Sequence, residues 1–323
     1  MSNLNLKARA IQVGLAQAAL AAVLLAVMSL SVLPANGQAQ KSFATPEEAV
    51  KALISAAKAE NLDELMAILG PEAKDVLSSG DPVVDRLNRQ VVLTAFDQQW
   101  KLEDQKDGTK AILVGHEDWP LPIPLVKEAN GWRFDTAAGK EEILFRRIGR
   151  NELNTIQACQ MYVHAQSEYA RRGHDGKPEG LYAQKFPSDP GMQNGLYWAA
   201  KPGEPLSPLG NLVAEATSEG YFQEGTNPNP NRAPRPFHGY YFRMLTAQGS
   251  GAPGGAKSYI VNGDMSGGFA LAAWPADYGN SGVMTFIINQ DGIVYEKDLG
   301  EETAALAGQM KDYNPNETWS KVE

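Results

Sequence analysis

The sequence predicts an α+β protein in which two domains follow a removable N-terminal segment. Three features lead to this prediction. Apolar residues first recur at a helical spacing, the spacing changes to two after Trp100, and a second helical stretch from about Lys140 is again followed by strands. We therefore expect helices on a curved antiparallel sheet, and after them a long helix with an antiparallel meander.

The first 39 residues have the composition of a secretory signal peptide. Lys7 and Arg9 form a basic start, residues 18–33 are almost all apolar, and small residues lead from Pro34 to Ala39. The alternative is an uncleaved membrane anchor, but a spanning helix needs about 20 apolar residues and this run is shorter. We expect cleavage after Ala39, a mature chain without a stable membrane span, and a periplasmic or secreted location.

The first predicted domain covers residues 40–138 and begins with helices. Thr45-Pro-Glu-Glu48 is a capping box with proline at the first helical position, Asn61 can cap a second helix, and a third begins near Asp81. Asn130-Gly131 predicts a tight hairpin, because both turn residues tolerate positive φ. The strands of this domain are expected at residues 101–104, 111–114, 124–128 and 132–134.

This order of helices and strands resembles the nuclear-transport-factor-like (cystatin-like) fold over residues 43–136. The resemblance rests on the pattern of elements. That fold hosts enzymes, ligand binders and dimerisation modules, so the resemblance implies an architecture and leaves the function open.

The second predicted domain covers residues 139–323. Its helix runs from about Lys140 to Arg172, with Gly149 as a candidate break, and carries an apolar stripe that includes Cys159. Glycine and proline are then dense from 173 to 255, which predicts long loops. Strands are expected at residues 238–245, 258–261, 268–273, 283–288 and 293–296.

Two blocks of this domain resemble type IV pilin-like proteins. Residues 151–169 are similar to the soluble half of the pilin-like helix, and residues 282–300 to the closing hairpin of pilin-like globular domains. Together with Gly195-Leu-Tyr-Trp198 and residues 274–279, they resemble a bacterial secreted family catalogued as domain-of-unknown-function family 2950. That family implies no activity and no site residues. A pilus subunit is disfavoured, because a whole domain precedes the helix.

Charge and cysteine content exclude several classes of function. The formal net charge is −9, and losing Lys7 and Arg9 makes it more negative, so we expect no binding to nucleic acid or to anionic membranes. Cys159 is the only cysteine and can form no disulfide within the chain. Its place on the apolar stripe predicts a buried core residue, with pairing to another chain or nucleophilic chemistry as the alternatives.

The best catalytic candidates lie at the end of the long helix. His164 and Glu168 are four residues apart and share one helical face, and His174 and Asp175 follow just beyond the predicted end. Such a set could bind a metal or supply a general acid and base. The alternative, which we favour, is an exposed helical pair followed by an Asp-Gly turn. We expect no bound metal or cofactor.

Aromatic residues crowd the loops of the second domain, and they provide the candidate binding residues. One interpretation is a small core that holds long loops together; the other is a recognition face, since aromatic side chains give contact area at low entropic cost. The candidates for this face are Tyr197, Trp198, Tyr221, Tyr240 and Tyr241.

These observations favour a non-catalytic binding or interaction protein of the bacterial cell envelope, whose partner is an envelope protein or a small ligand. A periplasmic enzyme, either a hydrolase or metal-dependent, that uses His164, Glu168 and His174 is one alternative. A structural subunit of an envelope assembly is another.

Overall fold

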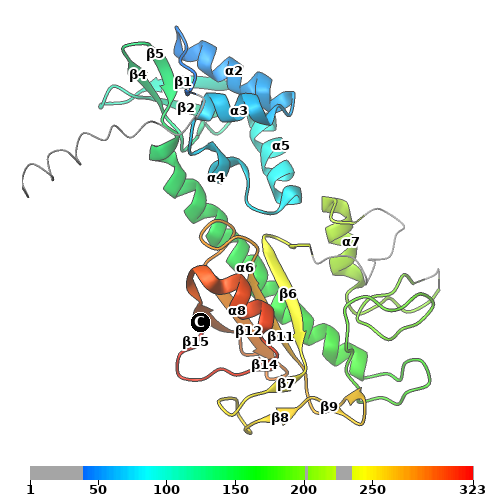
Figure 1. The fold of residues 1–323 in the computed structure, drawn as a ribbon. Helices are drawn as coiled ribbons and strands as arrows, with labels where there is room; N and C mark the ends of the chain where they lie inside the picture. The colour runs from blue at the N-terminus through cyan, green and yellow to red at the C-terminus, as the bar shows by residue number, and fades with distance from the viewer. Residues whose placement is uncertain (1–38, 201–202, 223–234, 323) are drawn as a thin grey trace, which may run out of the picture. The chain divides into compact units, whose positions relative to one another are not determined.

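The computed structural model describes residues 39–200, 203–222 and 235–322, and its fold is α+β, as the sequence predicts (Figure 1). The predicted signal peptide, apart from Ala39, lies outside the described residues.

The described chain begins with four helices, and three of them start at the predicted caps. Thr45 accepts a hydrogen bond from the amide of Glu48, Asn61 from that of Glu64, and Asp81 from two amides of the first helical turn. The sequence did not reveal the short α4, because five residues are too few to show a helical period. The helices are α2 (Pro46–Lys58), α3 (Leu62–Leu69), α4 (Ala73–Leu77) and α5 (Pro82–Gln98).

The first sheet is antiparallel, with the order β1-β2-β4-β5 and β3 paired to β2. The predicted hairpin at Asn130-Gly131 is confirmed, since β4 and β5 pair directly across it. Gly131 has φ +124°, and a Cβ atom there would lie 2.3 Å from the carbonyl oxygen of Phe43, so only glycine fits. The strands are β1 (Trp100–Asp104), β2 (Lys110–Val114), β3 (Trp119–Pro120), β4 (Leu125–Glu128) and β5 (Gly131–Phe134).

A first hydrophobic cluster lies between these helices and this sheet. Val50 and Ile68 come from the helices, while Ile112 and Leu125 come from the strands, and all four are fully buried. Burying each of these side chains contributes roughly 1.5–3 kcal/mol to folding. The cluster explains why α2 and α3 lie across the sheet.

The long helix α6 (Thr136–Ala170) has 35 residues and is continuous. The predicted break at Gly149 is wrong. One glycine costs a helix only about 1 kcal/mol relative to alanine, and packing along the rest of α6 outweighs that cost. The helix begins four residues before Lys140 because Asp135 caps it by accepting a hydrogen bond from the amide of Ala138.

The second sheet is antiparallel and has the order β15-β13-β12-β11-β6. All six residues of β11 are buried, because α6 covers one face of the sheet and α8 (Thr303–Gln309) the other (Figure 1). Such a strand carries apolar residues on both sides and shows no alternation. The strands are β6 (Tyr240–Leu245), β11 (Ala270–Pro275), β12 (Met284–Asn289), β13 (Tyr295–Asp298) and β15 (Ser320–Lys321).

Short elements complete this part of the chain. β7 (Ala247–Gln248) pairs with β8 (Lys257–Ser258) and, in parallel, with β14 (Asp312–Tyr313). The other elements are β9 (Ile260–Val261), β10 (Asp264–Met265), α7 (Gly210–Glu219) and the 3₁₀ turn η1 (Gly300–Glu302).

Cys159 belongs to a second hydrophobic cluster, which lies between α6 and this sheet. The residue is buried, as predicted, and burial raises the pKa of its thiol to about 12. At neutral pH the thiol is therefore protonated and is a poor nucleophile.

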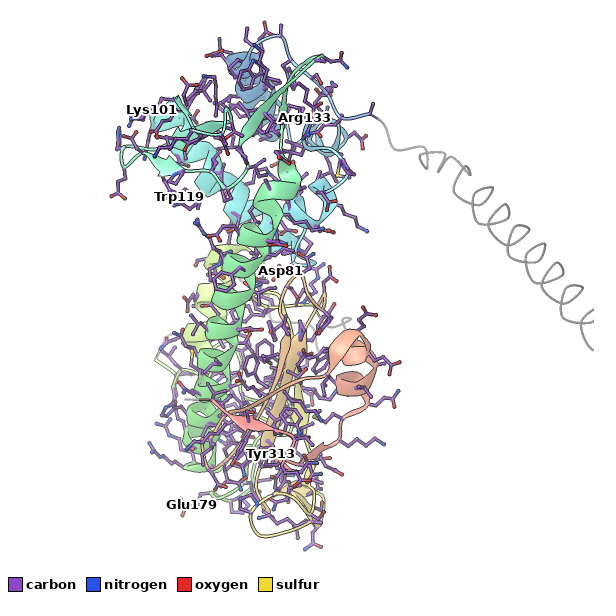
Figure 2. The ribbon with its side chains drawn as sticks, turned by 90° about the vertical axis from the view of Figure 1, so that its left-hand side faces the viewer. Asp81, Lys101, Trp119, Arg133, Glu179 and Tyr313 are labelled. Atoms are coloured by element: carbon purple, nitrogen blue, oxygen red, sulfur yellow. The ribbon has the colours of Figure 1, made fainter. Side chains whose placement is uncertain are left out.

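The carboxylate of Asp81, a residue labelled in Figure 2, is hydrogen-bonded to segments that are distant in the sequence. Its side chain is 1% exposed, and Oδ1 caps α5. Oδ2 accepts hydrogen bonds from the Tyr221 hydroxyl at 2.7 Å and from the amide of Gly239 at 3.0 Å. Contacts place residues 40–323 in one compact unit, and the predicted division into 40–138 and 139–323 stays a prediction.

We expect Asp81→Ala to lower the free energy of unfolding by about 2–4 kcal/mol, because it removes a helix cap and leaves two donors without a partner. Tyr221→Phe is the comparison: it removes the bond to Asp81 and the one that the hydroxyl accepts from the His238 amide, but it keeps the cap of α5, so it should cost about 1–2 kcal/mol. Chemical denaturation followed by circular dichroism measures both. Equal losses for the two variants would contradict the role given to Asp81.

Candidate functional site

The four predicted catalytic residues have different surroundings. His164 and Glu168 are exposed on α6, and His174 is half-buried beyond its end. Asp175 has φ +51°, and its carboxylate accepts a hydrogen bond from the amide of Gln193 at 2.8 Å, so it holds a loop. Within the described ranges, no three His, Cys, Asp or Glu side chains come together as a metal site.

Of the five predicted binding residues, four belong to hydrophobic clusters, and three of these (Trp198, Tyr221 and Tyr240) are buried. Tyr240 is 0% exposed and donates its hydroxyl to the Met284 carbonyl, and Tyr221 is bonded to Asp81. Tyr197 and Tyr241 are half-buried. Tyr221 and Tyr240 are thus packed in the interior, and a binding role for all five residues stays a prediction.

Trp198 is buried but also lines a small pocket of about 80 Å³ beyond the C-terminal end of α6. His174 lies between two aromatic rings there. Its ring stacks on Tyr169 at a centroid distance of 4.0 Å and lies 5.6 Å from the ring of Trp198. We call this hollow the Trp198 pocket. It is lined by Glu168, Tyr169, Arg172, Gly173, His174, Gln193, Trp198, Pro205, Leu206 and Pro208.

Two nitrogen atoms of this pocket have no hydrogen-bond partner in the described chain, although both are buried: His174 Nδ1 and Trp198 Nε1. His174 Nε2 lies 3.0 Å from the Tyr169 carbonyl oxygen and must donate to it. In a neutral imidazole, Nδ1 is then an acceptor, whereas the indole N–H of Trp198 is a donor. The pocket therefore combines one unused acceptor with one unused donor, and each costs about 1–3 kcal/mol while unpaired.

Polar side chains at the end of α6 hold the loops that form this pocket. Gln166 is fully buried, and its amide donates to the Ala183 carbonyl at 2.8 Å and accepts from the Ala183 amide at 2.9 Å. The Tyr169 hydroxyl donates to the carbonyl of Gln193 at 3.0 Å. These contacts replace the backbone partners that an irregular loop lacks.

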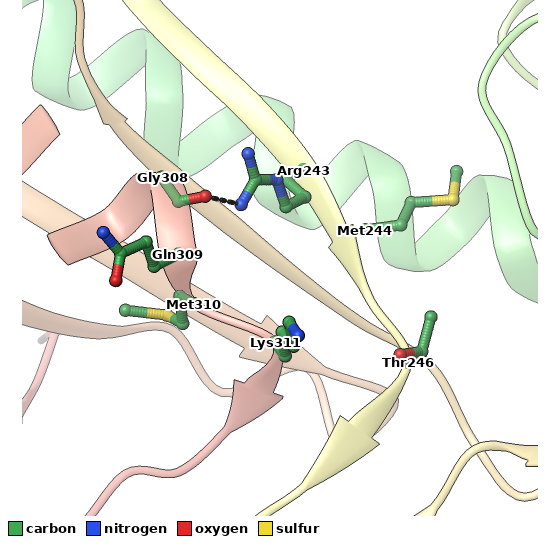
Figure 3. A pocket seen from close by; sticks show the side chains of 7 residues that line it. All are labelled: Arg243, Met244, Thr246, Gly308, Gln309, Met310 and Lys311. Carbon is green, nitrogen blue, oxygen red and sulfur yellow. Dashed lines mark hydrogen bonds between the residues drawn. The ribbon is translucent and has the colours of Figure 1, made fainter. Parts of the chain in front are cut away.

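A larger hollow of about 510 Å³ lies between β6 and the C-terminal end of α8 (Figure 3). Arg243 extends across it and donates a hydrogen bond to the Gly308 carbonyl, and its guanidinium lies 5.3 Å from the ring centre of Trp274. We call this hollow the β6 pocket. It is lined by Arg243, Met244, Thr246, Gly308, Gln309, Met310 and Lys311.

Sequence reasoning missed the β6 pocket, because its two walls are more than 60 residues apart in the sequence. One signal was present. Arg243 is the only charged residue in a strand that otherwise reads Tyr-Tyr-Phe-x-Met-Leu, and a charge at that position needs a partner or a reason to be retained.

The comparisons with known proteins agree with the resemblance to an uncharacterised family. A family model described as "Protein of unknown function (DUF2950)" matches residues 40–322. The chain belongs to the DUF2950 family. No curated protein and no solved structure matches it significantly.

For this DUF2950 chain, the likeness of residues 43–136 to the cystatin-like fold stays a prediction, as does that of the second half to pilin-like domains. None of the helices in the described ranges has both the length and the apolar character needed to cross a bilayer.

We expect Gln166→Leu to lower the free energy of unfolding by about 2–4 kcal/mol, because it leaves both backbone groups of Ala183 unpaired in the core. Gln160→Leu is the control, since Gln160 is exposed on the same helix and should change stability by less than about 0.5 kcal/mol. Urea denaturation provides the measurement. A Gln166→Leu protein as stable as Gln160→Leu would show that Gln166 does not hold the loop.

Proposed function

We propose that this DUF2950 chain is an exported, non-catalytic binding protein of the bacterial cell envelope, which holds a polar group of a small ligand in the Trp198 pocket. The observation that carries the proposal is the pair of buried nitrogen atoms, His174 Nδ1 and Trp198 Nε1, that line one pocket without partners. A ligand that satisfies both recovers their desolvation cost on binding.

The two nitrogen atoms determine which chemical group fits. A hydroxyl or a primary amide accepts the indole N–H of Trp198 and donates to the Nδ1 atom of His174. A carboxylate offers no proton to Nδ1 of a neutral His174, and an ammonium offers no acceptor to Trp198. The pocket holds about 80 Å³, so it takes one such group while the rest of the ligand lies outside.

The lining also describes the remainder of the ligand. Leu206 is 66% exposed and lies between Pro205 and Pro208 at the pocket, so the loop presents an apolar surface. This surface favours a ligand whose hydroxyl or amide is attached to a ring or a short hydrocarbon chain. Both nitrogen atoms are covered, and binding therefore requires part of the pocket lining to shift.

The enzyme alternative has weaker support at the same place. Glu168 lines the Trp198 pocket, but within the described chain no hydrogen bond connects it to His174. A general acid and base that act together normally lie within hydrogen-bond reach of each other or of a common substrate atom. The exposed position of His164 on α6 adds no third group to the pocket.

We expect a hydroxyl- or amide-bearing ligand to shift the indole N–H resonance of Trp198 in a two-dimensional NMR spectrum of the mature chain. The probes are a panel of simple sugars, polyols and amino-acid amides, and native mass spectrometry of protein purified from the envelope adds any molecule that is already bound. The resonance is assigned by its loss in Trp198→Phe. Leu306→Ala, which changes an exposed side chain on α8, is the control and should leave the ligand shift unchanged.

His174→Phe keeps a stacked ring but removes Nδ1 together with the Nε2 bond to the Tyr169 carbonyl, so it should abolish the shift, and circular dichroism checks that the fold is retained. If no probe and no co-purified molecule shifts the Trp198 resonance, or if an ordered water satisfies both nitrogen atoms in the ligand-treated protein, the proposal fails.

Export provides a separate prediction. Expressed from its full sequence in a bacterium, the protein should be recovered outside the cytoplasm with Gln40 as its N-terminal residue, because small residues at positions 37 and 39 fit signal peptidase. N-terminal sequencing measures this. Ala39→Leu should block processing, and a wild-type protein that retains Met1 in the membrane fraction would contradict the export proposal.

A further inference from the structure

Strand β6 forms an edge of the second sheet. Its only partner in the described chain is β11, and the opposite side of the strand faces no other strand (Figure 1). An edge strand presents backbone N–H and C=O groups that another chain can pair with.

The register shows which backbone groups of β6 point outward. The Ala276 amide donates to the Gly239 carbonyl at 2.9 Å, directly opposite it in the register. Hydrogen-bonded and non-bonded pairs alternate in an antiparallel ladder, so Arg243 bonds toward β11 while Phe242 and Met244 point their N–H and C=O groups away from it.

The open stretch has definite ends. At one end, the outward groups of Tyr240 already pair with Phe237, at 2.8 and 3.1 Å. At the other end, the Thr246 amide donates to the Lys311 carbonyl at 3.4 Å. Phe242 and Met244 between them offer two donors and two acceptors with no partner in the part of the chain that the structure describes.

Uncompensated positive charge lies next to this stretch. Arg243 and Lys311 both line the β6 pocket, whose lining includes no carboxylate (Figure 3). Neither side chain forms an ion pair with any described residue. In a chain with a formal net charge of −9, such a cationic hollow attracts a negatively charged group.

We propose that an extended peptide segment of a partner protein pairs with the open edge of β6 and places an acidic side chain in the β6 pocket. Its backbone bonds with Phe242 and Met244, and its carboxylate contacts Arg243 and Lys311. Main-chain pairing of this kind supplies affinity, and the pocket supplies specificity. The site is separate from the Trp198 pocket and does not depend on the function proposed for it.

A second copy of the chain fits the edge less well. Two β6 strands that pair antiparallel through Phe242 and Met244 place the two Arg243 residues directly opposite each other. Like charges opposite each other in a ladder are destabilising. The same charge that opposes self-association favours an acidic segment of another protein.

Panning of phage-displayed random nonapeptides against the mature chain tests the proposal. We expect the enriched peptides to contain Asp or Glu within a β-prone segment. Synthetic versions, labelled with a fluorophore, should bind more weakly as salt rises. Replacing the acidic residue by its amide should weaken binding about tenfold, as expected for the loss of one charge-assisted contact.

Three variants of the chain locate the binding. Met244→Pro removes an outward N–H while the bonds between β6 and β11 remain, so it should abolish binding. Lys311→Gln should weaken binding by about threefold to tenfold. Lys321→Gln makes the same charge change on β15, at the opposite edge of the sheet, and should have no effect.

Circular dichroism and thermal unfolding check that Met244→Pro folds. Hydrogen exchange of the wild-type protein gives a second readout, since the amides of Phe242 and Met244 should become protected when an enriched peptide is added.

Four results would overturn the proposal. The first two are that panning enriches no peptide, or that the enriched peptides contain no Asp or Glu. The other two are that Met244→Pro binds the peptides as tightly as the wild-type protein, or that hydrogen exchange at the amides of Phe242 and Met244 does not change when a peptide is added. A wild-type dimer that Met244→Pro converts to a monomer would also overturn it, because a second copy would then occupy the edge.

Discussion

The structure depends on α6 as a source of hydrogen bonds for backbone groups that no strand or helix satisfies. Arg147 is buried and donates to the carbonyls of Asp75 and Val76, at 2.8 and 2.6 Å. Glu152 accepts from the amides of Val283 and Met284, at 2.9 and 3.0 Å, and Gln166 binds both backbone groups of Ala183. One helix therefore positions α4, the start of β12 and a long loop. Each buried contact is costly to break, because the backbone group left behind loses its partner.

The local elements of the fold were predictable because local signals decide them. Helix caps at Thr45, Asn61 and Asp81 and the turn at Asn130-Gly131 act within four residues, and the structure has all of them. The role of α6 was not predictable in the same way. Polar residues such as Gln166 look like a solvent-exposed face in the sequence, and only the folded structure shows that loops cover them.

The candidate sites were only partly accessible from the sequence. His174 and Trp198 were both noted as candidates, but for different reasons, and their meeting depends on two loops that no periodic pattern describes. Arg243 and Lys311 come together through the order of the strands and the return of the chain after α8, which are long-range properties. Tyr221 and Tyr240 were candidates for a recognition face, but both are buried. Composition alone does not distinguish an aromatic core from an aromatic surface.

The two candidate surfaces have one physical cause. At the Trp198 pocket the unmet groups belong to side chains, and at the edge of β6 they belong to the backbone. The first arrangement selects a small group by its pattern of donors and acceptors. The edge of β6 can pair with the backbone of many different peptide sequences, and the positive charge of the β6 pocket distinguishes among them.

The strand order also determines when each half of the chain can fold. The first sheet draws all its strands from residues 100–134, so it can form early during synthesis. The second sheet includes β15, so it is complete only after residue 321 has been made. The neighbouring sheet includes β14, which pairs with β7, so it is complete only after residue 313 has been made. A nascent chain can therefore hold the complete first sheet while β12 still lacks its partner β13 and β11 still lacks the cover that α8 brings. During this interval the unfinished strands are the part of the chain most exposed to aggregation and most dependent on chaperones.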